Sequence, residues 1–369
     1  MKLGLFMQPV HDPARDVHQL FMDDLEIAVY LDELGYDEYW CGEHYAVVGE
    51  PMPSAMIFLA NLIARTERIM LGTGVIPLPV WHPAQVASHV AILDHLSEGR
   101  LMFGVASGGI AADWELFGAS EPSQMVADSL DIILKLWSED PPYNIEGKFW
   151  NVKLTENLME RHGVGQLLRP YQRPHPPIMI PAMSMNSPSM KFAGTRGYIP
   201  ISSQLIPIEA VASHRVMYQQ GCEEAGRPFD PEIWRVSRNI FVAESDAEAE
   251  AALRDPENKC NAAYYFEYIY DMVCSGGGKD YILPPKLVGT AAGESYSQYD
   301  YMRDNFIYGN PDTVVEKLIS IREEVGPFGT FIVSALDFPD RELHKRSLSL
   351  IAKEVMPRLG QMDVDVVGK

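Results

Sequence analysis

The chain has 369 residues, of which 47% are hydrophobic and 22% are charged, and its 30 basic and 51 acidic residues give a formal net charge of −21. This composition is typical of a folded protein with a large apolar core, and it excludes disordered and fibrous classes. The negative charge, with no basic run to offset it, argues against nucleic acid and anionic membranes as partners. Because no stretch approaches the roughly 18 apolar residues of a membrane span and the first apolar run is too short for a signal peptide, we expect a cytoplasmic protein.

Short apolar runs alternate along the chain with longer amphipathic stretches, which predicts parallel strands joined by helical crossovers. The predicted strands are 3–7, 38–41, 69–78, 101–106, 177–182, 198–201, 234–242 and 330–336. The predicted helices are 17–34, 54–65, 83–96, 123–137, 187–195, 208–225, 246–254, 311–325 and 341–359. Strands that are each followed by a helix, without an obvious linker, favour an α/β fold of the (β/α)8 TIM-barrel type. A doubly wound open sheet and two unrelated α/β domains are the alternatives, since counting strands does not prove closure.

Two segments do not fit this repeat, and we interpret them as insertions in a single domain that covers residues 1–369. Residues 141–176 have turn-rich ends and predict a short hairpin followed by an irregular loop. Residues 255–310 combine an aromatic, helix-like stretch with a glycine-rich break. Because long insertions between barrel elements often cover the active site, segment 255–310 is a candidate lid.

The functional groups of a TIM barrel gather at the C-terminal ends of its strands. Strand 38–41 is followed by Glu43 and His44. A histidine at this place can exchange a proton near neutral pH, and Glu43 can orient the loop or fix the imidazole tautomer. Taken alone, such a histidine is more often a hydrogen-bonded structural residue, so the position needs support from its neighbours.

Small residues lie at the ends of two further strands. Strand 69–78 contains Gly72-Thr73-Gly74, which lacks the third glycine of a dinucleotide fingerprint and precedes a proline instead of a helix. Strand 101–106 leads into Ala106-Ser107-Gly108-Gly109. Backbone without large side chains leaves a slot for a planar ring, although a pair of barrel-corner glycines explains the same residues.

The segment after strand 177–182 runs from Met183 through Ser184 and Asn186 to Ser187, where a helix is predicted to begin. Hydroxyl and amide groups beside the free N–H groups of a helix N-terminus suit a phosphate, and a capped helix without a ligand is the alternative. We find no metal-ligand spacing among the histidines and no Walker loop, so no metal site is expected. The four cysteines form no CxxC pair and are interpreted as reduced.

Several short motifs form an ordered series along the chain. They are Gly35-Tyr36-Asp37, Glu43-His44, Gly72-Thr73-Gly74-Val75, His82-Pro83, the run 93–100, Phe117-Gly118 and Gly309-Asn310-Pro311-Asp312. This series resembles the bacterial luciferase-like family of flavin-dependent monooxygenases over nearly the whole chain. Residues 186–194, 326–330 and 346–348 look most like the limonene and diketocamphane monooxygenase branch.

The resemblance implies roles for individual positions. His44 falls on the catalytic histidine, and Gly74-Val75 falls on a non-proline cis peptide bond that lies against the flavin ring. The remaining implied positions are Ala106, Ser107 and Gly108 beside the flavin, Met183, Ser184, Asn186 and Ser187 at the flavin phosphate, and Phe6 and Tyr265 at the substrate.

Two positions depart from luciferase itself. Ser107 stands where luciferase has an arginine that helps to hold the phosphate, and Tyr45 stands where luciferase has a second histidine. The first departure means that the positive charge has to come from another residue, for which the candidates are Arg161, Arg169, Arg173 and Lys191. The second argues against an aldehyde-specific or light-emitting role.

The resemblance also implies an activity. A two-component monooxygenase takes reduced FMN as co-substrate from a separate NAD(P)H-dependent flavin reductase, forms a C4a-peroxyflavin with O2 and oxygenates a small hydrophobic ketone, aldehyde or terpene. A Baeyer–Villiger insertion is the reaction of the diketocamphane branch. An F420-dependent hydride-transfer oxidoreductase and a non-catalytic flavin-binding protein are the alternatives. The family further implies a homodimer formed through helices 54–65 and 83–96.

Overall fold

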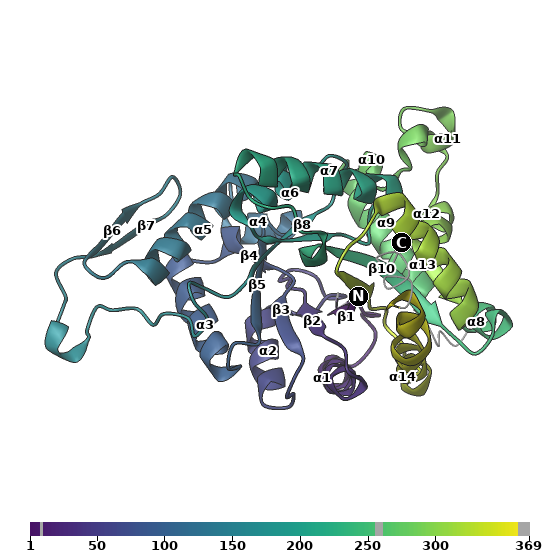
Figure 1. The fold of residues 1–369 in the computed structure, drawn as a ribbon, viewed down its shortest axis with the longest axis horizontal. Helices are drawn as coiled ribbons and strands as arrows, with labels where there is room; N and C mark the ends of the chain where they lie inside the picture. Colours follow the sequence, from purple (N-terminus) through teal and green to yellow (C-terminus); the bar gives the residue numbers. More distant parts are fainter. Residues whose placement is uncertain (8–9, 255–260, 361–369) are drawn as a thin grey trace. The chain divides into compact units, whose positions relative to one another are not determined.

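The computed structural model describes residues 1–7, 10–254 and 261–360. Its main sheet contains eight parallel barrel strands, most of which are labelled in Figure 1. They are β1 (Lys2–Met7), β2 (Glu38–Cys41), β3 (Met70–Thr73), β5 (Leu101–Ala106), β8 (Ile178–Ala182), β9 (Ile199–Ser202), β10 (Arg235–Val242) and β12 (Thr330–Ser334). The hydrogen-bonded order is β10-β12-β1-β2-β3-β5-β8-β9, and β9 pairs with β10 again. This is the topology of a closed barrel, which confirms the predicted TIM-barrel fold and excludes an open sheet.

The chain forms two compact units. Unit 1 comprises Met1–Tyr39 and Ile180–Lys369, and unit 2 comprises Trp40–Met179. Strands β2 and β8 each continue from one unit into the other. The assignment of residues 1–369 to a single domain stays a prediction.

Unit 2 contains the helices that follow β2, β3 and β5. They are α2 (Ala55–Ile63), α3 (Pro83–Leu96), α4 (Ala111–Phe117) and α5 (Pro122–Ser138). Ser54 starts α2, since its side chain accepts a hydrogen bond from the backbone N–H of Ile57. The unit also contains the antiparallel hairpin of β6 (Tyr143–Glu146) and β7 (Asn151–Leu154), which confirms the hairpin predicted for segment 141–176 (Figure 1).

The third strand differs from its prediction. Instead of one strand over residues 69–78, the structure has β3, then the cis peptide bond Gly74–Val75, then the short β4 (Ile76–Pro77) and a 3₁₀ turn at Leu78–Val80. Both pieces pair with β5 in parallel. The apolar run is therefore continuous in sequence while the strand is not.

Unit 1 contains the remaining helices. They are α1 (Val17–Leu34), α6 (Pro188–Arg196), α7 (Ile208–Glu224), α8 (Asp246–Leu253), α9 (Ala262–Ser275), α10 (Lys279–Ile282), α11 (Ala291–Glu294), α12 (Gln298–Asn305), α13 (Pro311–Val325) and α14 (Arg341–Leu350), the last continued by a π-helical turn at Ile351–Val355. Gly35 ends α1 with a left-handed φ of 89°. Prolines occupy the first turn of α6 and α13, as the sequence predicts.

The insertion predicted over residues 255–310 is folded through most of its described length. Phe266 and Tyr301, from α9 and α12, are buried in one apolar cluster with Phe241 of β10. The insertion also contains β11 (Phe306–Gly309), a strand that the sequence does not predict and that pairs with β10. Residues 255–260 lie outside the described residues, and a lid role for this segment stays a prediction.

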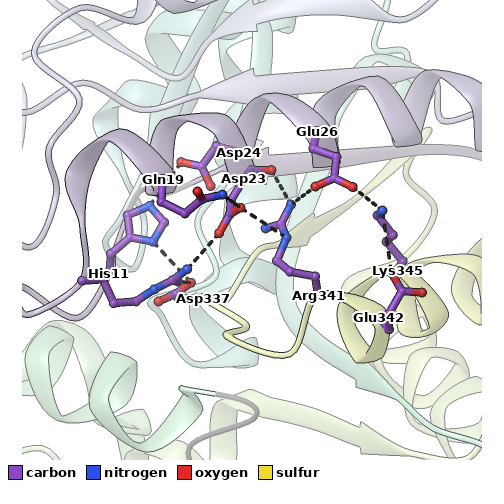
Figure 2. A network of polar contacts seen from close by, with 10 residues as sticks. His11, Gln19, Asp23, Asp24, Glu26, Asp337, Arg341, Glu342 and Lys345 are labelled. Carbon is purple, nitrogen blue, oxygen red and sulfur yellow. Dashed lines mark hydrogen bonds and ion pairs between the residues drawn. The ribbon is translucent and has the colours of Figure 1, made fainter.

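Ion pairs connect the beginning of α1 to the segment after β12 (Figure 2). The Nε2 atom of buried His11 lies 3.2 Å from Asp24, and its Nδ1 atom lies 3.4 Å from Asp337. Arg15 bridges Asp23 at 2.8 Å and Asp337 at 2.5 Å. A polar cluster therefore fixes two chain segments that are far apart in the sequence.

His11 is positively charged at neutral pH in this cluster. Burial lowers the pKa of His11, but the hydrogen bonds and charges of its two carboxylate neighbours outweigh burial and raise the pKa to about 9. The network continues along α1, where Glu26 pairs with Arg341 and Lys345 of α14 (Figure 2).

Two further sequence predictions concern membranes and cysteines. Within residues 1–7, 10–254 and 261–360, no helix combines the length and apolar character that a bilayer crossing needs. Cys41 and Cys222 are buried cysteines outside any disulfide, and Cys274 is a half-buried one. Cys260 lies outside the described residues.

Candidate active site

His44 lies in unit 2, three residues after the end of β2, with its side chain 18% exposed. The imidazole lies between two carboxylates: Nε2 is 3.2 Å from Glu50 and Nδ1 is 3.6 Å from Asp113. Glu50 is fully buried in the loop before α2, and Asp113 lies in the first turn of α4. The arrangement places an accessible imidazole between two acidic groups that come from different strand ends.

The two acidic neighbours control the charge of His44. Burial lowers its pKa, but the bond to Asp113 and the charges of Glu50 and Asp113 outweigh burial, so the pKa is raised above its ordinary value of 6.5. The pKa of Asp113 is lowered, because its bonds to His44 and to the backbone N–H groups of Tyr45 and Ala46 outweigh the effect of burial. His44 is therefore suited to hold and donate a proton at neutral pH.

Glu43 does not contact the imidazole, which corrects the expectation that it fixes the tautomer of His44. Its Oε1 accepts hydrogen bonds from the Tyr45 hydroxyl at 2.6 Å and the Trp81 indole at 2.8 Å, and its Oε2 accepts one from the Ala55 backbone at 2.9 Å. Burial is the largest influence on this carboxyl and raises its pKa to about 7, although the three bonds act in the opposite direction. Glu43 thus orients the loop, which is the other role that the sequence analysis gave it.

The small residues at the strand ends fall into two groups. Gly72 and Gly104 serve packing: a Cβ atom on Gly72 would lie 2.2 Å from the ring of Trp40, and one on Gly104 would lie 1.9 Å from the carbonyl oxygen of Thr73. A Cβ atom on Gly109 would meet nothing within 4 Å. The open positions therefore lie at the ends of the strands, beyond the buried glycines.

The strand ends of unit 2 meet one another. The N–H of Gly74 donates to the carbonyl of Cys41 at 2.7 Å, which joins the end of β2 to the end of β3. Pro77 pairs with Ala106 in the β4–β5 ladder. The predicted positions Gly74, Val75, Ala106, Ser107 and Gly108 are all half-buried, whereas residues 71–73 and 101–105 directly before them are buried. The structure thus brings the predicted unit 2 residues to one edge of the sheet with accessible backbone.

Within unit 1, the predicted segment Met183, Ser184, Asn186 and Ser187 connects β8 to α6. Met183 and Asn186 are exposed, and Asn186 has a left-handed φ of 51°. Ser187 is the N-cap residue of α6, but its side chain makes no capping hydrogen bond. The predicted helix start is confirmed, and a ligand at this segment stays a prediction.

The two predicted substrate residues differ in accessibility. Phe6 of β1 is half-buried, whereas Tyr265 of α9 is 1% exposed and accepts a hydrogen bond from Gln204 at 3.3 Å. Two of the proposed phosphate-binding cations are engaged on the surface, Lys191 with Glu224 at 2.6 Å and Arg169 with Asp140 at 2.8 Å.

With this geometry established, comparison with known proteins decides the family. Residues 1–327 match the family model described as luciferase-like monooxygenase. The chain belongs to the luciferase-like monooxygenase family. The 4-hydroxyprotoasukamycin monooxygenase of Streptomyces nodosus subsp. asukaensis is 31% identical to this luciferase-like monooxygenase, over 98% of this chain and 94% of the relative.

Two other relatives are named as the oxygenating part of a monooxygenase. The oxygenating constituent of 3,6-diketocamphane monooxygenase from Pseudomonas putida, a type II Baeyer–Villiger monooxygenase solved in complex with FMN, superposes with a TM-score of 0.83 at 30% identity, covering 97% of this chain and 98% of that one. The oxygenase component of a flavin-dependent trigonelline monooxygenase from Acinetobacter baylyi is 28% identical over 99% of this chain and 97% of the relative. The predicted likeness to the diketocamphane branch is confirmed.

The residues of unit 2 fit a flat flavin ring. Residues Gly74, Val75 and Ala106–Gly108 at the strand ends are half-buried, and the cis peptide bond expected between Gly74 and Val75 is present. The indole of Trp114 donates to the carbonyl of Ser107 at 2.7 Å, which fixes the backbone at this position. A planar ring can approach such a surface closely because no side chain larger than valine stands at these positions.

The sequence analysis missed Glu50, Asp113 and Trp81. Asp113 lies on α4, a seven-residue helix that the periodicity does not reveal. Glu50 and Trp81 lie in irregular segments near the strand ends. An acidic residue shortly after each neighbouring strand end was the available signal, but only the fold shows that both face the same histidine.

Proposed function

We propose that this luciferase-like monooxygenase is the FMN-using oxygenase component of a two-component system. It accepts reduced FMN from a separate NAD(P)H-dependent flavin reductase in the cytoplasm and inserts one oxygen atom from O2 into a small hydrophobic substrate. A ketone in a Baeyer–Villiger reaction is the preferred substrate class, before aldehydes and terpenes. The observation that carries the proposal is the accessible His44 between Glu50 and Asp113 at the same sheet edge as the Gly74–Val75 peptide.

The relatives support the cofactor and the partner. One similar structure holds FMN and is named an oxygenating constituent, and another relative is named an oxygenase component. Bound reduced flavin supplies the oxygen-activating chemistry, and the protein supplies orientation, exclusion of water and proton control. Structures of F420-dependent enzymes share the fold at 21% and 18% identity, which carries no argument about the cofactor.

In this proposal the chain's residues divide three tasks among them. His44 provides a proton at its imidazole, whose pKa its acidic neighbours raise above the ordinary value. The half-buried backbone at Gly74-Val75 and at Ala106, Ser107 and Gly108 positions the ring. Met183, Ser184, Asn186 and Ser187 hold the phosphate, and Phe6 and Tyr265 belong to the substrate side.

We further propose a homodimer that uses α2 and α3. Large apolar side chains are exposed on both helices, with Ile57 75% exposed, Ile92 48% and Leu96 58%. Exposed apolar side chains on adjacent helices favour association with another copy. Light scattering of the wild type and of Ile57→Glu tests this: we expect a dimer that the charge weakens, and a monomeric wild type would contradict it.

An isotope experiment tests the proposed activity. The protein is combined with FMN, a flavin reductase, NADH and a panel of ketones, aldehydes and terpenes under ¹⁸O2. The expected result is a product with one ¹⁸O atom that depends on both FMN and O2. Product that forms anaerobically with reduced F420 would replace the proposal by hydride transfer. Flavin binding without any product across the panel would favour a non-catalytic flavin-binding protein.

A further inference from the structure

A chain of hydrogen bonds in unit 1 ends at the segment that leads into α6. The indole N–H of Trp234 donates to Ser202 Oγ at 2.9 Å, and Ser202 Oγ lies 2.8 Å from Nδ1 of His214. Nε2 of His214 lies 2.7 Å from the carbonyl oxygen of Ser184. His214, on α7, and Ser202, at the end of β9, are both fully buried. The chain therefore connects the interior of the unit to the connection between β8 and α6.

The partners of His214 fix its protonation state. Because a carbonyl oxygen only accepts hydrogen bonds, Nε2 of His214 carries the hydrogen atom, and Nδ1 then accepts from the Ser202 hydroxyl. Burial lowers the pKa of His214 to about 4, against the opposing effect of the Ser184 bond. His214 is therefore a neutral imidazole with a single tautomer and is unsuited to exchange protons at neutral pH.

The same helix holds the segment at a second point. Ser213 Oγ accepts a hydrogen bond from the backbone N–H of Asn186 at 2.8 Å, and the same hydroxyl donates to the carbonyl of Ala210 at 2.6 Å. Asn186, which has a left-handed φ of 51°, is thus bonded directly to α7. Two adjacent residues of α7 thus fix residues 184 and 186, on either side of Met185.

Helix α6 itself is held tightly against α7. A Cβ atom on Gly194 would lie 2.3 Å from the carbonyl oxygen of Tyr218, and a Cβ atom on Gly221 would lie 2.1 Å from the carbonyl oxygen of Lys191. The two helix backbones therefore approach each other closely at both glycines. These contacts hold α6 from Lys191 onward, and the bonds of His214 and Ser213 hold the segment that leads into its first turn.

We propose that His214 is a positioning residue for phosphate recognition, because its bond to Ser184, together with the bond from Asn186 to Ser213, presets the 183–187 segment for the phosphate of FMN. This inference rests on the proposed function, which places that phosphate at Met183–Ser187. His214 touches no phosphate; it fixes the backbone that does. Pre-organisation of this kind improves affinity, because the segment then loses less conformational entropy when the ligand binds.

The test compares binding of FMN with binding of riboflavin, which lacks the phosphate. Calorimetric titrations of both reduced flavins under anaerobic conditions are carried out on the wild type, His214→Phe and His214→Gln. Phenylalanine keeps a similar volume but donates no hydrogen bond, whereas the glutamine amide can still donate to the Ser184 carbonyl. Tyr218→Phe is the matched control, since Tyr218 is a buried residue of the same helix one turn away from this contact.

The wild type is expected to prefer FMN, and His214→Phe is expected to reduce the preference about tenfold, the size of one lost hydrogen bond. His214→Gln retains most of the preference, Tyr218→Phe retains all of it, and riboflavin affinity changes little throughout. If the wild type prefers FMN and His214→Phe keeps the same ratio, the positioning role is overturned. A wild type that binds both flavins equally overturns the proposed phosphate site instead. If His214→Phe does not fold, Ser213→Ala is measured in its place. It is expected to lower the ratio of FMN affinity to riboflavin affinity as well, and an unchanged ratio overturns the positioning role.

Discussion

Replacing Glu43 by glutamine is expected to change how the stability of the protein depends on pH. Glu43 is 3% exposed, and burial raises its pKa from 4.5 to about 7. A carboxyl whose pKa is higher in the folded state stabilises that state below the unfolded pKa, and this contribution is lost as the pH rises through the folded pKa. At about 1.4 kcal/mol for each pKa unit, the loss between about pH 4.5 and pH 7 is about 3 kcal/mol.

The assay is urea unfolding of the wild type and Glu43→Gln across this pH range. At low pH the protonated carboxyl of Glu43 still has two oxygens that can accept a hydrogen bond, whereas glutamine has one, so the variant is expected to be about 1–3 kcal/mol less stable there. As the pH rises this deficit shrinks or reverses, because the variant has no carboxyl to ionise. Tyr45→Phe is the control: it removes a donor that lowers the pKa of Glu43, so the fall with pH becomes steeper. Parallel stability curves for the wild type and Glu43→Gln would refute this reasoning.

Three further predictions test other parts of the structure. Gly104→Ala places a Cβ atom 1.9 Å from a carbonyl oxygen of β3 and is expected to cost at least about 3 kcal/mol in chemical unfolding, whereas Gly109→Ala, with open space, stays within about 0.5 kcal/mol; equal effects would contradict the packing. Asp113→Asn removes a charge that raises the pKa of His44, so the alkaline limb of the pH–rate profile is expected to move to lower pH. An unmoved limb would show that Asp113 does not control the pKa of the group seen in the profile. His11 has its pKa raised from 6.5 to about 9, so it contributes about 3 kcal/mol of stability that is lost as the pH rises through 9. In His11→Gln the free energy of unfolding is expected to lack this fall with pH. An unchanged fall in the variant would show that another group causes it.

Regular periodicity predicts the scaffold of this fold well. The helices Val17–Leu34, Pro83–Leu96 and Pro311–Val325 have the predicted bounds, because their apolar spacing and their caps agree. The strands β2 and β5 also match. Where helix or strand propensity, apolar spacing and capping residues all indicate the same element, its bounds can be predicted from the sequence alone.

The sequence does not predict features that depend on contacts between distant residues. The run 69–78 reads as one strand because its residues are apolar, but the cis bond after Gly74 divides it. Strand β11 is short and follows the polar helix α12, so only its pairing with β10 defines it. Glu43 precedes His44 in the chain, yet the imidazole meets Asp113, which lies 69 positions away from it along the sequence. Site geometry in this fold is set by loops from different strands, which local pattern does not encode.

The most direct test of the account measures oxygen transfer by His44→Ala in the presence of reduced FMN and O2, with a ketone that the wild type converts. We expect a rate of product formation about 10²–10⁴-fold lower, with FMN affinity changed only a few-fold, because the imidazole supplies a proton and does not hold the flavin. Full turnover by His44→Ala would contradict it.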